Sequence, residues 1–182
     1  MKTTLFAALS VLWISAPFVR SATVEVDTAR SRIQVDAKAT GHTFAGNLEK
    51  YTISVEGNAA TSQPTSLNLA WQFNDLKTAD DKRDEAMIKW LGGGKPKGSF
   101  KFEKSWDETP EGGQAQGILT INGVSKSVTF PYKVKREGEW VTIEGKVSMD
   151  YQNFSLPIIR SMAVMTVDPK LVIRFHVVGK IK

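Results

Sequence analysis

Apolar and polar residues alternate most regularly over residues 117–134, on both sides of the pair Asn122-Gly123. The apolar positions are odd-numbered before this pair and even-numbered after it: Leu119, Ile121, Val124, Val128, Phe130, Tyr132 and Val134. A two-residue turn would pair Ile121 with Val124 and bring both sets to one face. Asn-Gly favours such a turn because type I′ requires positive φ at both central residues. The pattern therefore predicts a β-hairpin with one buried face.

The same alternation recurs along the rest of the chain and predicts further strands. They fall within residues 33–39, 51–55, 67–73, 100–102, 141–149 and 171–177, and the turns are expected at 56–58, 111–113 and 137–138. Each strand has one apolar and one polar face, which is typical of a closed barrel or a two-sheet sandwich. Because closure removes exposed edges, we favour an all-β fold: one antiparallel barrel of about eight strands.

One segment has a helical period instead. Within residues 78–91 the apolar residues Met87, Trp90 and Leu91 recur at i, i+3 and i+4. Thr78 is the expected N-cap, and three consecutive glycines from Gly92 should end the helix. A single helix among antiparallel strands is expected to serve as a cap or a crossover.

The N-terminal residues 1–22 have the features of a secretory signal peptide: Lys2, an apolar run over residues 5–14, and Val19-Arg20-Ser21 as a cleavage site. A membrane anchor needs about 20 apolar residues, and this run is interrupted by polar residues and proline. We therefore expect residues 23–182 to form one domain. The chain has no cysteine, which favours an exported, periplasmic protein that is stabilised by packing alone.

Catalytic and metal-binding patterns are weak. The histidines are His42 and His176, no cysteine can complete a metal site, and no nucleophile elbow is present. Removing Lys2 and Arg20 would lower the net charge from +5 to about +3, and the basic residues alternate with acidic ones, so a nucleic-acid footprint is not expected. His42 remains open between a loop residue and a polar group at a cavity rim.

Large apolar side chains are abundant at the inward-facing positions. An eight-stranded barrel can be filled by such side chains or can hold one ligand, and periodicity does not distinguish the two outcomes.

Five short segments stand out in order along the chain. They are Val26-Asp27-x-x-x-Ser31-x-Ile33, His42-Thr43-Phe44-x-Gly46, Asp81-Lys82-Arg83-Asp84 followed by Met87-Ile88, Gly117-x-Leu119-Thr120-Ile121-x-Gly123-Val124-x-Lys126, and the ending from Val167-Asp168 to Val177-Val178-Gly179. Together they resemble the corresponding segments of the YceI-like polyisoprenoid-binding proteins. The Gly117–Lys126 segment is the most specific of them.

This resemblance implies a lipocalin-like barrel that encloses a polyprenyl or quinone tail without catalysing a reaction and without a cofactor or metal. The ligand-binding side chains would be Phe44, Trp71, Phe73, Met87, Trp90, Phe100, Phe102, Leu119, Ile121, Phe130, Tyr132, Phe154, Ile173 and Phe175. His42, Arg83 and Asp84 would be polar rim residues, and Lys126 would also lie near the rim.

The expected partner is an isoprenoid or other long-chain lipid. No nucleic-acid partner and no membrane-spanning segment are expected, and the oligomeric state stays open, with a dimer as one option. Two alternatives remain: an enzyme that acts on a lipid-like substrate at the rim, and a structural or stress-related envelope protein with a filled core.

Overall fold

The computed structural model describes residues 21–161 and 165–182. The strands are β1 (Ser21–Val26), β2 (Arg32–Ala39), β3 (His42–Leu48), β4 (Thr52–Asn58), β5 (Pro64–Gln72), β6 (Leu76–Lys77), β7 (Lys97–Thr109), β8 (Gly112–Ile121), β9 (Val124–Glu137), β10 (Trp140–Asp150), β11 (Arg160–Ser161), β12 (Met165–Thr166) and β13 (Lys170–Ile181). Within these described residues, the fold also has one α-helix, α1 (Asp81–Trp90), and two 3₁₀ turns, η1 (Phe73–Asp75) and η2 (Tyr151–Phe154).

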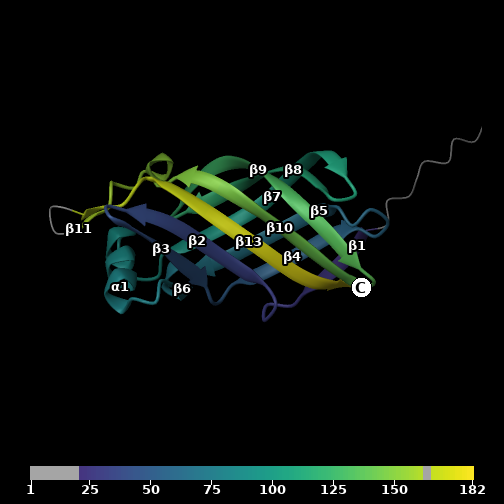
Figure 1. Ribbon diagram of the computed structural model, residues 1–182, viewed down its shortest axis with the longest axis horizontal. Helices are drawn as coiled ribbons and strands as arrows, with labels where there is room; N and C mark the ends of the chain where they lie inside the picture. Colours follow the sequence, from purple (N-terminus) through teal and green to yellow (C-terminus); the bar gives the residue numbers. More distant parts are fainter. Residues whose placement is uncertain (1–20, 162–164) are drawn as a thin grey trace, which may run out of the picture.

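Eight antiparallel strands close into a barrel, which confirms the predicted fold class. Their order is β1-β4-β5-β7-β8-β9-β10-β13, and β13 pairs again with β1. The barrel is elongated: α1 and β11 lie at one end, and β1 and the C-terminus lie at the other (Figure 1). We call these the α1 end and the β1 end.

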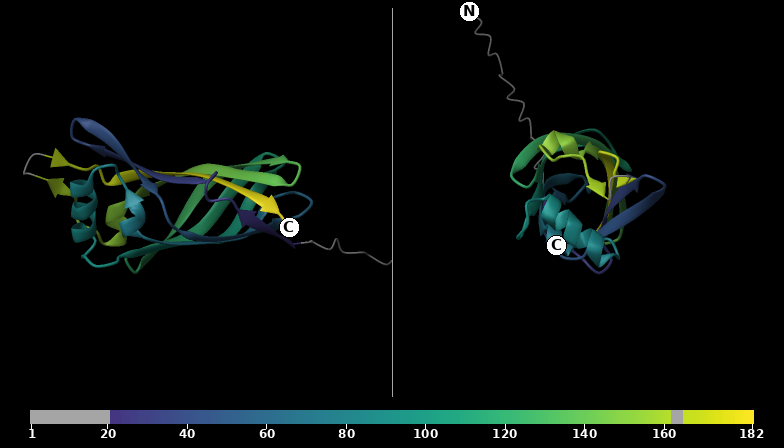
Figure 2. Two further views of the ribbon diagram at one scale, coloured as in Figure 1. Left: turned by 90° about the horizontal axis from the view of Figure 1, so that it is seen from below. Right: turned by 90° about the vertical axis from the view of Figure 1, so that its left-hand side faces the viewer.

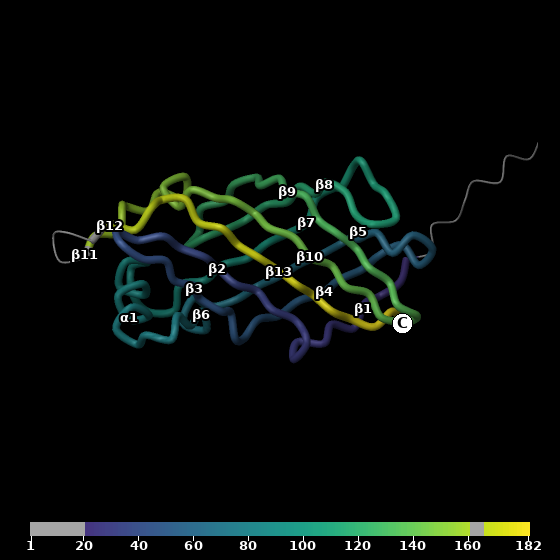
Figure 3. Tube along the Cα trace, in the orientation of Figure 1, coloured from purple at the N-terminus to yellow at the C-terminus, as the bar shows by residue number. Residues whose placement is uncertain are grey.

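The second edge of β13 is shared by two strands. Near its start, β13 pairs with β2 from Val172 to His176, and near its end it pairs with β1 from Gly179 to Ile181. β3 and β6 then extend the sheet from β2 at the α1 end. The trace in Figure 3 shows β2 running toward that end and β3 returning from it, so the barrel wall there includes this extension.

The β8–β9 hairpin has the predicted register. Ile121 pairs with Val124 and Leu119 with Lys126, and both Asn122 and Gly123 have positive φ. Leu119 and Ile121 are buried, whereas Lys126 is exposed although it shares their face. The side chain of Asn122 also donates a hydrogen bond to the carbonyl of Leu91, just after α1, which places this turn at the α1 end.

Helix α1 lies across the α1 end of the barrel, as the end-on view in Figure 2 shows. The prediction of Thr78 as N-cap is wrong: Asp80 caps the helix, and its side chain accepts a hydrogen bond from the Arg83 amide. Thr78 lies before the cap, and its hydroxyl donates a hydrogen bond to the Asp84 carboxylate. Gly92, Gly93 and Gly94 all have positive φ, consistent with their predicted role in ending the helix.

Two further local predictions need correction. Residues 56–58 belong to β4, where a register shift occurs between Glu56 and Gly57, and the reversal follows them. Residues 42–48 form strand β3, which the alternation pattern did not reveal. The predicted signal peptide falls almost wholly outside the described residues, and β1 begins at Ser21. Within residues 21–161 and 165–182, no helix is long and apolar enough to cross a membrane.

Candidate functional site

The barrel interior contains a cavity of about 680 Å³. This lies within the range of roughly 300–1,000 Å³ that is usual for small-molecule sites. Its lining comes from strands around the whole barrel, from α1, and from the segment that precedes β11. The lining is mostly aliphatic and aromatic, and it has few polar side chains. The barrel is therefore hollow, not filled.

The lining contains almost every residue that the sequence predicted as ligand-binding. These are Phe44, Trp71, Phe73, Met87, Trp90, Phe100, Phe102, Leu119, Ile121, Phe130, Tyr132, Ile173 and Phe175. Phe154 is not among them, because η2 places it in the packed core, where it is 3% exposed. Their contact with a ligand stays a prediction.

Four inward-facing glycines explain why the aromatic side chains line the cavity without filling it. A Cβ at any of these positions would overlap or closely approach an aromatic side chain on the neighbouring strand. The pairs are Gly98 with Trp71, Gly117 with Phe100, Gly145 with Phe175, and Gly113 with Tyr132. Each side chain therefore lies close against the barrel wall, where the missing Cβ leaves room for it. The remaining volume stays open at the barrel axis.

Three of the lining rings form a continuous aromatic surface halfway along the barrel. Phe130 lies between Phe100 and Phe175, with ring centroids 5.8 and 5.6 Å away. The tilted and edge-to-face geometries are those that aromatic pairs prefer. Since β7, β9 and β13 each contribute one ring, this surface spans strands that are far apart in sequence.

Polar contacts close the cavity toward the β1 end. The hydroxyl of Tyr132 donates to Oε1 of Gln63 at 2.6 Å, and Nε2 of Gln63 donates to the carbonyl of Thr109 at 2.6 Å. Both Tyr132 and Gln63 are 4% exposed. Burial raises the pKa of Tyr132 above its ordinary value of 10.0, and the charge of Glu108 adds to this. The hydroxyl therefore remains protonated and donating at neutral pH.

Charged side chains border the cavity at the α1 end, which we call the mouth. They are Asp80, Lys82, Arg83 and Arg160, and His42 joins them. The guanidinium of Arg83 lies 4.3 Å from the centroid of the Phe44 ring, and the His42 ring is 6.0 Å from the same ring. Polar atoms are thus concentrated where the cavity meets solvent, as an amphiphilic ligand would require.

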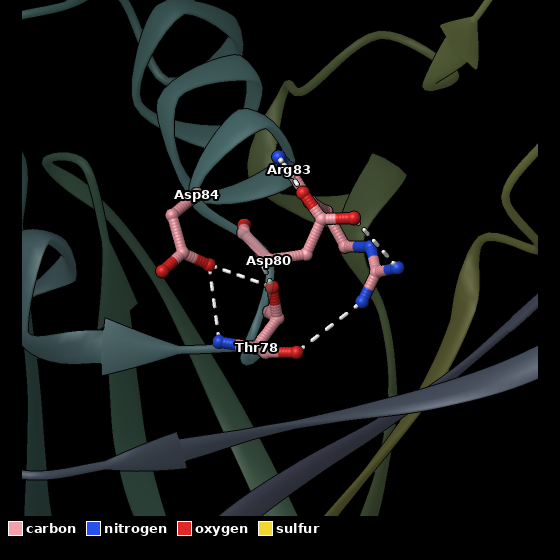
Figure 4. Close-up of polar contacts among 4 residues, drawn as sticks. All are labelled: Thr78, Asp80, Arg83 and Asp84. Atoms are coloured by element: carbon pink, nitrogen blue, oxygen red, sulfur yellow. Dashed lines mark hydrogen bonds and ion pairs between the residues drawn. The ribbon is translucent and has the colours of Figure 1, made fainter.

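Asp84 does not lie at the mouth, contrary to the prediction that grouped it with Arg83. It is 7% exposed, and its Oδ1 accepts hydrogen bonds from the amide and hydroxyl of Thr78 at 3.0 and 2.7 Å (Figure 4). Arg83 points the other way, toward the Thr78 carbonyl and the Asp80 carboxylate, each at 3.4 Å. Asp84 thus fixes the start of α1 and does not line the cavity.

Replacing Asp84 with alanine is expected to lower the free energy of unfolding by about 2 kcal/mol, because two donors of Thr78 lose a charged acceptor. Urea denaturation would measure this change. Glu85→Ala is the matched control, since Glu85 is an exposed neighbour on the same helix, and its effect should stay within about 0.5 kcal/mol. Equal effects of the two substitutions would contradict the assigned role.

Tyr151 holds the other side of the mouth. Its hydroxyl accepts a hydrogen bond from the Ile159 amide at 3.1 Å and donates one to the Val167 carbonyl at 2.9 Å. Its ring packs edge-on against Trp90 with centroids 5.2 Å apart, and the Trp90 indole donates to the Pro157 carbonyl at 2.9 Å. Burial raises the pKa of Tyr151, which keeps this hydroxyl protonated. Tyr151 and Trp90 therefore join helix α1 to the chain around β11 and β12.

Sequence reasoning missed several lining residues. The apolar ones include Ile33, Val35, Leu67, Leu69, Val147, Met149 and Leu171. The alternation that predicted their strands could have identified them, because they share the inward register. No sequence signal marked Ile158 and Arg160 as mouth residues, since that segment lacks a clear period.

The described residues contain no group of three or more histidine, aspartate, glutamate or cysteine side chains that could hold a metal ion. His176 lies on the outer face of the barrel, and its Nδ1 is 3.4 Å from a Glu144 carboxylate oxygen. Within residues 21–161 and 165–182, the large hydrophobic side chains that are exposed are Trp106 and Ile158.

Comparisons with solved structures give the same fold. Burkholderia cenocepacia BcnA superposes with a TM-score of 0.72 at 19% identity, covering 85% of this chain and 99% of that one. The Campylobacter jejuni YCEI protein gives a TM-score of 0.53 at 16% identity, covering 85% of this chain and 80% of that one. At these identities the likeness concerns the fold alone.

Among curated proteins, the chain is 26% identical over 138 residues to the membrane protein insertase YidC of Chlorobaculum parvum. This match covers 72% of the chain but only 22% of the length of that relative. The model of the family described as YceI-like domain matches residues 25–179. This match begins within β1 and ends within β13, so it spans nearly the whole barrel. The protein therefore belongs to the YceI-like family.

Proposed function

We propose that this protein binds a long-chain isoprenoid lipid, with a polyprenyl or quinone tail, inside the barrel and carries or sequesters it in the periplasm. The observation that carries the proposal is the apolar cavity of about 680 Å³, whose charged side chains are confined to one end. An isoprenoid tail has almost no polar atoms, so its affinity must come from buried apolar area, at roughly 25 cal/mol per Å².

The geometry supports a ligand that enters tail first. Along β13, Leu171 and Val177 both line the cavity, and their six-residue separation corresponds to about 20 Å along this tilted strand. A tail along this path would contact the aromatic surface of Phe100, Phe130 and Phe175, while a polar head would remain beside the mouth residues. The periplasmic location rests on the signal-peptide pattern of residues 1–22.

The two alternatives have less support. An enzyme would need its polar groups to converge, whereas His42 packs against Phe44 and the Asp84 carboxylate is directed to Thr78. A structural protein with a filled core does not fit the hollow interior. We therefore propose binding without catalysis.

Native mass spectrometry of the protein purified without detergent tests the proposal. We expect a bound species whose mass and extract identify a long-chain lipid, or uptake of an added isoprenoid by the emptied protein. A folded protein that carries no lipid and takes up none would contradict it.

A matched pair of variants on β9 tests whether the ligand lies inside the barrel. Val128 lines the cavity, whereas the next residue, Thr129, is exposed on the outer face. Val128→Trp should abolish the bound species by occupying the interior, and Thr129→Trp should retain it. Circular dichroism would establish that both variants are folded.

A further inference from the structure

The cavity ends partway along the barrel. Its deepest lining residues toward the β1 end include Pro64, Ala115, Tyr132 and Ile143. The next inward-facing residues of β9 and β10, Val134 and Val141, are buried but do not line the cavity. A layer of side chains therefore divides the barrel interior into an open part and a packed part.

A small void lies beyond this layer. Its volume is about 10 Å³, and it is bordered by Val55, Val141 and Ile181. Pro64 and Ile143 border both this void and the main cavity, so they form part of the division between them. The void is near the lower limit for one water molecule, which is too small for a lipid tail.

The hydrogen bonds of Tyr132 and Gln63 make this division rigid. Tyr132 is held by Gln63, which is itself held by the Thr109 carbonyl. An apolar tail offers no hydrogen bond to replace these, and a buried polar group left unpaired is costly. A tail that reaches Tyr132 therefore gains nothing by displacing it.

We propose that Tyr132, positioned by Gln63, sets the maximum tail length that the cavity accepts. This inference rests on the proposed lipid-binding function and adds the selection of chain length to it. Each isoprene unit added to a short tail buries more apolar area and raises affinity. Once the tail reaches Tyr132, further units remain outside and add little.

The test measures the affinities of prenols of increasing length, from geraniol and farnesol to longer prenols. Quenching of tryptophan fluorescence provides the readout, because Trp71 and Trp90 line the cavity. For the wild type we expect a gain of about tenfold or more per unit up to a limiting length, followed by a plateau. Tyr132→Ala should move that limit by at least one unit toward longer prenols.

Phe44→Ala at the mouth is the control. It should weaken binding of all prenols by a similar factor and leave the limiting length unchanged. Because Tyr132→Ala also leaves Gln63 without its partner, Ile143→Ala serves as a second variant that opens the same layer, and it should move the limit in the same direction.

A folded Tyr132→Ala or Ile143→Ala variant that keeps the wild-type limit would overturn the length-limiting role while leaving lipid binding intact. If the wild type binds no prenol of any length and carries no lipid, the proposed function itself fails. Affinities that continue to rise through the longest prenols in the wild type would also contradict the length limit.

Discussion

Replacing Tyr151 with alanine is expected to lower the free energy of unfolding by about 3–5 kcal/mol, as for other large buried aromatic side chains. Tyr151 is 0% exposed, it packs against Trp90, and its hydroxyl joins Ile159 to Val167. The substitution removes the packing and leaves two partly buried backbone groups without their partner. Urea denaturation would measure the change in free energy.

One further variant separates the contribution of the Tyr151 ring from that of its hydroxyl, and a variant of another aromatic residue serves as the control. Tyr151→Phe keeps the ring and should cost about 1–3 kcal/mol. Hydrogen exchange at the Ile159 amide should accelerate in both Tyr151 variants, because that amide loses its acceptor. Trp106→Ala removes an aromatic side chain that is 36% exposed, and we expect a much smaller effect on stability. A Tyr151→Ala effect no larger than that of Trp106→Ala would show that Tyr151 does not hold the mouth together.

Gly98→Ala is expected to weaken lipid binding by about fivefold or more, because a bound ligand would force the indole back into an overpacked position, at a cost of roughly 1–3 kcal/mol. A Cβ at Gly98 would overlap the Trp71 indole, and the nearest atoms are all in that side chain. The indole must therefore move into the cavity and occupy volume that a ligand needs. Tryptophan fluorescence titration with one prenol would measure the loss.

The neighbouring position provides a matched control. Ser99→Thr also adds one methyl group to β7, but on the opposite face of the strand. It should bind the prenol like the wild type. Combining Gly98→Ala with Trp71→Leu should restore part of the affinity, because the smaller side chain no longer needs the space at Gly98. Unchanged binding by Gly98→Ala alone would mean that the glycine is not needed to hold the indole against the wall.

Much of the fold follows from local sequence. The pairing of individual residues in the β8–β9 hairpin was predictable, because Asn122-Gly123 specifies the turn and the alternation specifies the register. Strand β3 was missed, because residues 42–48 carry a histidine, threonine, glycine and asparagine among few large apolar residues. The cap of α1 was misplaced by two residues, because Thr78 and Asp80 are both good cap residues.

The candidate site was only partly predictable. Inward-facing apolar residues on each strand follow from the period of two, and nearly all of those named do line the cavity. Asp84 and Arg83 are adjacent in sequence, yet the helix turns their side chains in different directions (Figure 4). Adjacency along a helix therefore did not predict that only one of them would reach the mouth.

The sequence by itself determined most of the long strands, the hairpin register, the helix within residues 78–91, and the family to which the chain belongs. Only the tertiary structure decided that the barrel is hollow and where the cavity ends. The physical reason is that both depend on pairs brought together across strands, such as Gly98 with Trp71 and Gln63 with Tyr132. The members of such pairs lie far apart along the chain, so no local pattern shows that a glycine leaves room for a ring or that a glutamine holds a tyrosine in place.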